Sequence, residues 1–122
     1  MTDANATARR YVAMWNEPDA ERRRSEIAAL FAGDNEHFIT SQEVRGADAM
    51  ERRVTTSYEK WVRDARYLFH LAGEPQSHHG GVLLRWRMAP ASGGGDVSLG
   101  SAFLVLADDG RIRRDWQFTD PS

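Results

Sequence analysis

The sequence predicts an α+β fold in which helices come first and a meander of antiparallel strands follows. Apolar residues recur with helical spacing up to about Lys60. Beyond Lys60, short runs of β-forming residues alternate with turn residues. The last two runs are joined by Asp108-Asp109-Gly110, and Asp-Gly between apolar runs is a strong hairpin signal. Helices followed by strands favour packing of the helices on one face of a curved sheet.

Length and composition limit the classes of protein that this chain can represent. A chain of 122 residues is expected to form one domain, residues 1–122, around a single core. The net charge is −2 and the arginine pairs are interleaved with acids, so we expect no nucleic-acid partner. There is no cysteine and no run of 18 apolar residues, which predicts no disulfide, no membrane partner and a cytoplasmic location.

Three helices are expected in the N-terminal half of the chain. The first ends at Asn16-Glu17-Pro18, since the residue before a proline avoids the helical region. The second begins near Asp19 and is expected to end at Gly33, which can adopt a left-handed cap conformation. The third follows a turn at Arg45-Gly46. Their buried faces are predicted to contain Ala8, Tyr11, Val12 and Trp15, then Ala20, Ile27, Leu30 and Phe31, then Ala47, Met50, Val54, Ser57 or Tyr58, and Trp61.

Six strands are expected. Glu36–Ser41 alternates as a short strand that places His37 and Ile39 on one face. Ala89–Asp96 reads as a loop, because proline and clustered glycine do not hold a strand ladder. The other five predicted strands are Arg66–Leu71, Gln76–His79, Val82–Met88, Val97–Ala107 and Ile112–Phe118.

The last two strands combine an apolar run with polar side chains. Leu99–Leu106 is almost continuously apolar, which predicts a strand covered on both faces. The returning strand alternates, and its polar residues are the first place to look for chemistry. Alternation puts Ile112, Trp116 and Phe118 on one face and Arg113, Asp115 and Gln117 on the other.

Short motifs spread over the whole chain resemble the SnoaL-like branch of the nuclear transport factor 2-like superfamily. These motifs are Arg10-Tyr11-Val12-Ala13 with Asn16, Leu30-Phe31-Ala32, Val44-Arg45-Gly46, Asp109-Gly110-Arg111-Ile112 and the ending Phe118-Thr119-Asp120-Pro121. The resemblance implies that the sheet curls into a cone, that helices close its wide side, and that a mostly apolar cavity lies between them. It also implies that Asp115 and Gln117 face this cavity. Such a scaffold hosts many activities, so the fold alone does not name one.

The catalytic sets of three related enzyme groups are each incomplete in this chain. By resemblance to ketosteroid isomerases, the helix-one tyrosine falls on Tyr11, but the general base falls on Ile39 and the second oxyanion donor on or next to Ala102. SnoaL-type polyketide cyclases have histidine at the position of Asp115 and aspartate at that of Gln117. Limonene-type epoxide hydrolases also need aspartate at the position of Gln117. They also need Arg-x-Asp where this chain has Arg85-Trp86-Arg87.

Three residues are candidates for acid/base chemistry. Asp115 can exchange a proton if burial raises its pKa, Tyr11 can donate to an oxyanion or hydroxyl, and His37 titrates near neutrality. Each has a structural alternative. Asp115 would form a surface ion pair with Arg85, Arg87 or Arg113. Tyr11 would be an ordinary core tyrosine, and His37 a hydrogen-bonded histidine in the cavity wall. The resemblance also implies a substrate-binding lining, for which core packing is the alternative. That lining consists of Trp15, Ile39, Val54, Tyr58, Trp61, Ala102, Leu104 and Gln117.

No cofactor and no metal are expected. His78 and His79 are adjacent on a predicted strand and should point to opposite faces, so that they would not share an ion.

The sequence therefore predicts a protein that binds a small apolar or amphipathic molecule. It would be an acid/base isomerase, cyclase or hydrolase without a cofactor, or a non-catalytic ligand-binding or dimerisation module. A homodimer through Trp86 or Trp116 on the outer sheet face would let both faces of the last strand be covered.

Overall fold

The computed structural model describes residues 3–121 and contains three α-helices, a π-helical segment and seven strands. The helices are α1 (Ala4–Met14), α2 (Ala20–Leu30) and α3 (Ala47–Ser57), and α3 continues into the π-helical segment η1 (Tyr58–Asp64). The strands are β1 (Phe31–Ile39), β2 (Gln42–Arg45), β3 (Tyr67–Leu71), β4 (Gln76–His78), β5 (Gly81–Pro90), β6 (Ser98–Leu106) and β7 (Ile112–Thr119).

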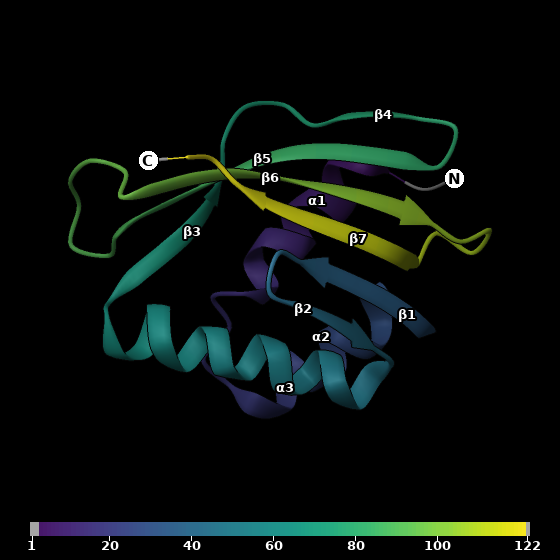
Figure 1. Cartoon of the computed structure of the whole chain (residues 1–122), viewed down its shortest axis with the longest axis horizontal. Coiled ribbons are helices and arrows are strands. Elements are labelled where there is room, and N and C mark those ends of the chain that lie inside the picture. Colours follow the sequence, from purple (N-terminus) through teal and green to yellow (C-terminus); the bar gives the residue numbers. More distant parts are fainter. Residues whose placement is uncertain (1–2, 122) are drawn as a thin grey trace.

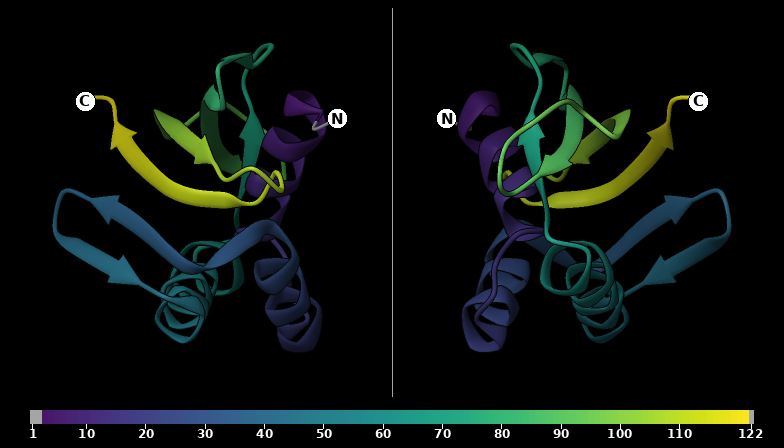
Figure 2. Two further views of the ribbon diagram at one scale, coloured as in Figure 1. Left: turned by 90° about the vertical axis from the view of Figure 1, so that its right-hand side faces the viewer. Right: turned by 90° about the vertical axis from the view of Figure 1, so that its left-hand side faces the viewer.

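All seven strands belong to one open sheet in the order β2-β1-β7-β6-β5-β3, with β4 on β5. Only the β1–β7 pair is parallel. Figures 1 and 2 show the strongly bent strands, with α2 and α3 side by side below the sheet. The α1 helix packs against β3 and β5. The predicted α+β class, with helices on a curved and mainly antiparallel sheet, is confirmed.

Aspartate caps begin the first two helices. The Asp3 carboxylate accepts hydrogen bonds from the backbone N–H groups of Asn5 and Ala6, and Asp19 caps α2 in the same way. Each cap satisfies N–H groups that have no partner inside the helix. The predicted first helical face is confirmed, since Ala8, Tyr11, Val12 and Trp15 are all buried.

Several predicted boundaries are wrong for local reasons. Phe31 leaves the helix in an extended conformation and pairs with Ile112, so β1 starts there and Gly33 lies inside a strand rather than in a cap. The short polar strand β2 gave no alternation signal. Helical structure continues to Asp64, beyond the predicted change at Lys60. Ala20 and Ala47 begin their helices and are exposed rather than buried.

A bulge in β7 decides which side chains face the core. Val105 pairs with Arg114 while Leu106 pairs with Ile112, so Arg113 is an extra residue in the ladder. Ile112 and Asp115 therefore share the buried face, and both are 0% exposed. The predicted faces are corrected accordingly: Ile112 does not lie with Trp116, and Arg113 is exposed while Asp115 is buried.

The outer face of the sheet carries a row of large apolar side chains. Leu83, Phe103, Trp116 and Phe38 are successive register partners across β5, β6, β7 and β1, and we call them the outer row. Trp116 stacks on Phe38 with ring centroids 5.1 Å apart. Leu83 and Phe103 are 42% and 39% exposed, so the prediction that β6 is covered on both faces is wrong within this chain.

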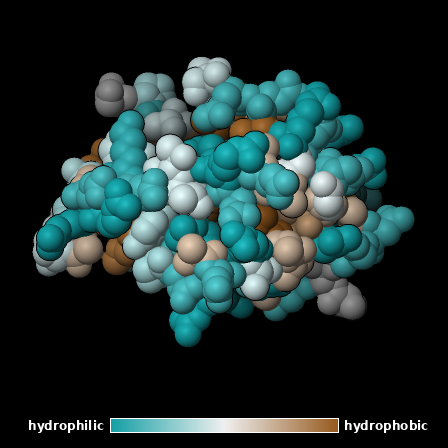
Figure 3. Space-filling model, turned by 90° about the horizontal axis from the view of Figure 1, so that it is seen from below, coloured by the Kyte–Doolittle hydropathy of each residue, from teal (hydrophilic) through white to brown (hydrophobic). Residues whose placement is uncertain are grey.

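The face seen from below in Figure 3 is mostly hydrophilic, and hydrophobic atoms show mainly in recesses between polar side chains. Within residues 3–121, none of the helices has the length and apolar character needed to span a membrane.

Candidate functional site

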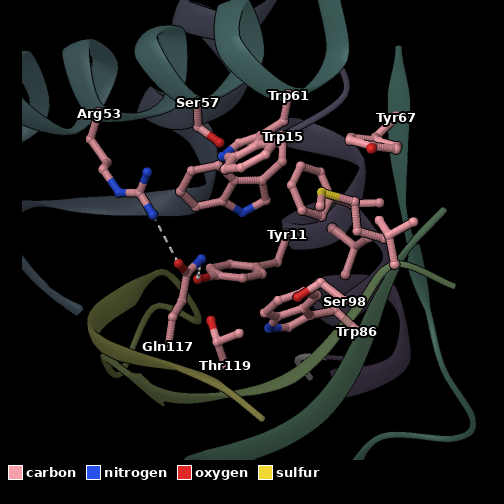
Figure 4. A pocket seen from close by; sticks show the side chains of 14 residues that line it. Tyr11, Trp15, Arg53, Ser57, Trp61, Tyr67, Trp86, Ser98, Gln117 and Thr119 are labelled. Atoms are coloured by element: carbon pink, nitrogen blue, oxygen red, sulfur yellow. Dashed lines mark hydrogen bonds between the residues drawn. The ribbon is translucent and has the colours of Figure 1, made fainter. Parts of the chain in front are cut away.

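A pocket of about 510 Å³ lies between α1, the α3–η1 helix and the inner face of the sheet (Figure 4). Much of its wall is aromatic, with Trp61 near Tyr67 and Phe69 edge-on to Trp86. Its volume is within the range of small-molecule sites. The lining residues are Tyr11, Val12, Trp15, Arg53, Ser57, Trp61, Tyr67, Phe69, Trp86, Met88, Val97, Ser98, Gln117 and Thr119.

Behind one wall of the pocket, five side chains form a closed ring of hydrogen bonds, which we call the Arg53–Asp115 network. In one arm, Arg53 Nε donates to His37 Nε2 at 3.3 Å, and His37 Nδ1 lies 2.7 Å from Asp115 Oδ2. In the other arm, Arg53 Nη2 donates to Gln117 Oε1 at 3.1 Å and Gln117 Nε2 donates to the Tyr11 hydroxyl at 2.9 Å. Tyr11 then donates to Asp115 Oδ2 at 2.6 Å.

The parallel pairing of β1 with β7 assembles the centre of this network. His37 and Asp115 are direct register partners, so their side chains leave the sheet side by side. Gln117 follows two residues later on the same strand and faces the same way. Tyr11 reaches the centre from α1 and Arg53 from α3.

The direction of the hydrogen bonds fixes the protonation of the histidine. Arginine can only donate, so His37 Nε2 must be an acceptor and carries no proton. The remaining proton is on Nδ1 and is donated to Asp115. His37 is therefore a neutral imidazole, and every bond in both arms runs from the Arg53 cation to the Asp115 carboxylate.

Burial shifts the acid/base properties of two members of the network. Burial, reinforced by the negative charge of Asp115, holds the pKa of the Tyr11 phenol well above its ordinary value. Burial also lowers the pKa of the Arg53 guanidinium, and the negative charges of Asp115 and of Tyr11 once it is ionised oppose that shift. Tyr11 is thus a neutral hydrogen-bond donor at physiological pH.

The structure places the three candidate acid/base residues together but not all on the pocket surface. Tyr11 lines the pocket, whereas His37 and Asp115 are 0% exposed and lie behind it. Of the two residues bonded to Asp115, only Tyr11 lines the pocket, so Asp115 reaches a ligand through Tyr11. The surface alternative for Asp115 is wrong, because the three arginines considered pair with other carboxylates. Arg85 pairs with Asp120, Arg87 with Asp96 and Arg113 with Asp34.

The remaining expected lining residues divide into two groups. Trp15, Trp61 and Gln117 line the pocket. Val54, Ala102 and Leu104 are fully buried in the hydrophobic core instead. Tyr58 packs under the Arg23 guanidinium, 4.8 Å from its ring centre, and Ile39 pairs with Gln42 at the end of β1.

Sequence reasoning missed Arg53, the cationic end of the network. A signal was present, since Arg53 lies three residues after Met50 and four before Ser57 and thus on the predicted buried face of α3. A charged residue within an apolar stripe needs a buried partner. Arg53 also lies over the Trp15 ring, with its Cζ 4.9 Å from the ring centre.

The side chains of His78 and His79 lie together, although the sequence predicted that they point to opposite faces of a strand. His79 has φ +50° and leaves the strand, which brings its Nδ1 to 3.0 Å from His78 Nδ1. Among residues 3–121, no group of three or more histidine, aspartate or glutamate side chains is arranged to hold a metal ion.

Comparisons with known structures show which class of protein this fold resembles. A SnoaL-like family protein from Agrobacterium tumefaciens strain C58, proposed to be an isomerase, aligns with TM-score 0.86 and 28% identity over 95% of this chain and 96% of that one. A nuclear transport factor 2-like protein from Exiguobacterium sp. 255-15 aligns with TM-score 0.73 and 21% identity over 95% and 99%. A proposed polyketide cyclase from Sinorhizobium meliloti aligns with TM-score 0.70 and 17% identity over 93% and 94%.

The predicted resemblance to the SnoaL-like branch of the nuclear transport factor 2-like superfamily is therefore confirmed. No protein-family model matches the sequence, and no curated protein sequence matches it either.

The raised pKa of Tyr11 predicts a loss of stability at alkaline pH. In the unfolded chain tyrosine ionises near pH 10, whereas the folded chain keeps the Tyr11 proton, so folding becomes less favourable as pH rises above about 10. Between pH 10 and 11, the free energy of unfolding should fall by about 1 kcal/mol more in the wild type than in Tyr11→Phe, since the unfolded tyrosine is already half ionised at pH 10. Urea unfolding at both pH values measures this, and equal pH dependence in the two proteins would contradict it.

Proposed function

We propose that this chain binds a small amphipathic molecule in the pocket, with a ring system against the aromatic wall. The observation that carries the proposal is a pocket of ligand size with aromatic walls and a polar side at Arg53, Tyr11 and Gln117. The similarity to SnoaL-like proteins supports it, since the protein with the highest alignment score reported above is a proposed isomerase.

A substitution at the pocket edge tests this site. Thr119 is exposed and lines the pocket near Trp86, whose ring packs over the partner residue Gly100, so an indole at position 119 would extend over the opening. Titration calorimetry with a panel of bicyclic and tricyclic aromatic ketones, including 2-tetralone, should show binding to the wild type. Thr119→Trp should weaken binding at least about tenfold, equivalent to about 1.4 kcal/mol.

Phe118→Trp is the matched control, because it adds an indole ring system one residue away, at an exposed position outside the pocket. It should bind the panel like the wild type. Absence of binding by every ketone, or unchanged binding to Thr119→Trp, would refute the proposed site.

A second candidate function is acid/base catalysis through Tyr11. The observation that favours it is the short chain from the pocket through the Tyr11 hydroxyl to the Asp115 carboxylate. A proton leaving a ligand carbon would bond to the Tyr11 oxygen, while the Tyr11 proton moves to Asp115 Oδ2. The electron pair of the broken C–H bond stays on the ligand as an enolate. Asp115 is then the base and Tyr11 the group that touches the ligand.

Hydrogen exchange of a bound ketone tests this candidate. In deuterated buffer, the wild type should accelerate loss of the α-hydrogens of 2-tetralone above the buffer rate, as followed by NMR. Tyr11→Phe should abolish the acceleration because the relay loses its oxygen, and Asp115→Asn should do so because it loses the base. Exchange at the buffer rate in the wild type would refute the enolisation of this ketone and leave ligand binding as the function.

We further propose that a second copy of the chain covers the outer row. Four large apolar side chains in register across four strands form a continuous strip, and such strips mark interaction surfaces. A two-fold axis through the sheet would pair the strip with itself. Trp86, the other residue considered for this interface, lines the pocket on the inner face instead.

Sedimentation velocity at micromolar concentration tests the dimer. The wild type should sediment as a dimer, and Phe103→Glu should sediment as a monomer because it places a charge in the middle of the strip. Ala13→Glu, at an exposed position on α1, is the control and should stay dimeric. A monomeric wild type would contradict the proposal.

A further inference from the structure

Arg53 retains donors that the network does not use. Its Nε and Nη2 atoms bond to His37 and Gln117, while no hydrogen bond of Nη1 and no ion pair of Arg53 is formed with any other residue in 3–121. The side chain is half-buried and lines the pocket. A guanidinium removed from water without a facing anion is costly, so its free edge is suited to an anionic group.

Two further donors lie beside this edge. The Trp15 ring is 4.9 Å from Arg53 Cζ, and its Nε1–H is buried without a hydrogen-bond partner in the described chain. Figure 4 shows this indole edge turned into the pocket above Tyr11. Ser57, one helical turn after Arg53, also lines the pocket, and its hydroxyl is a further donor there. We call Arg53, Trp15 and Ser57 the donor cluster.

An unpartnered buried N–H is rare, because the lost hydrogen bond to water is not replaced. The Asp115 carboxylate does not supply the missing acceptor, since it is enclosed behind Tyr11 and His37. The Tyr11 hydroxyl already donates its proton to that carboxylate. The lining residues include no carboxylate, so a negatively charged acceptor for the donor cluster has to come from a ligand.

The rest of the wall has the opposite character. Trp61, Tyr67, Phe69 and Trp86 present ring faces and edges to the pocket, together with Met88. Aromatic side chains of this kind bind flat ring systems.

We propose that the ligand is an aromatic carboxylic acid whose carboxylate bonds to the donor cluster and whose fused rings lie against the aromatic wall. This inference rests on the proposed binding function and adds the charge of the ligand to it. A carboxylate matches the fork of the guanidinium, and the Trp15 N–H and Ser57 hydroxyl can bond to the same two oxygens.

The test compares 2-naphthoate with 2-naphthamide, which has the same rings and nearly the same shape but no charge. Titration calorimetry should show that the wild type binds the acid at least about tenfold more tightly than the amide, as expected for hydrogen bonds to a charged group. Arg53→Gln should lose this preference. Arg52→Gln removes the same charge from the neighbouring exposed position and should keep it.

A second variant keeps the arginine in place. Trp15→Phe removes the indole N–H donor together with part of the ring. It should weaken binding of the acid severalfold more than it weakens binding of the amide. This result remains informative if Arg53→Gln does not fold, which circular dichroism would reveal.

Each outcome separates this inference from the proposed binding function. Equal binding of acid and amide by the wild type, or an acid preference that survives in Arg53→Gln, would overturn the inference and leave pocket binding intact. Binding of the neutral ketone panel without binding of the acid would likewise overturn the inference and leave pocket binding intact. Failure of the acid, the amide and the ketone panel together would overturn both.

Discussion

The structure depends on how it keeps the carboxylate of Asp115 out of water. An isolated buried carboxylate costs several kcal/mol, and this one is 0% exposed. Its Oδ2 accepts from Tyr11 and His37, and the cation that balances it is Arg53, at the far end of both arms. One charge pair, separated by three neutral side chains, thus connects α1, α3, β1 and β7 at a single point.

The same arrangement sets the chemistry of the pocket. Because Tyr11 and His37 direct their protons to Asp115, they offer a ligand no free donor in the resting state. Arg53 is held by two hydrogen bonds and by the Trp15 ring, so its remaining edge faces the pocket. The pocket therefore presents cationic and N–H donors on one side and aromatic rings on the other, while the carboxylate stays out of reach.

The sequence revealed the fold more fully than the site. Apolar periodicity located all three helices and, together with the turn residues between runs, the five C-terminal strands, because burial of one face leaves a period in the sequence. The faces of the last strand did not follow from alternation, since one bulged residue reverses the pattern without any signal in composition. Asp115, Tyr11 and His37 were named as candidates, but Arg53 was not, since it belongs to one of the arginine pairs that are interleaved with acids. Its role depends on contacts with residues 16 and 64 positions away, which no local pattern contains.

That bulge decides which residues of β7 face the pocket, because side chains in a strand alternate with a period of two. If Arg113 were paired in the ladder like its neighbours instead of being bulged out, the strand after Ile112 would be turned over. Trp116 and Phe118 would then face the pocket, and Asp115 and Gln117 would join the outer row. A carboxylate on the apolar outer face and two more rings in the pocket would remove both the network and the surface available to a second copy. The single irregular residue in β7 thereby separates the polar inner site from the apolar outer face.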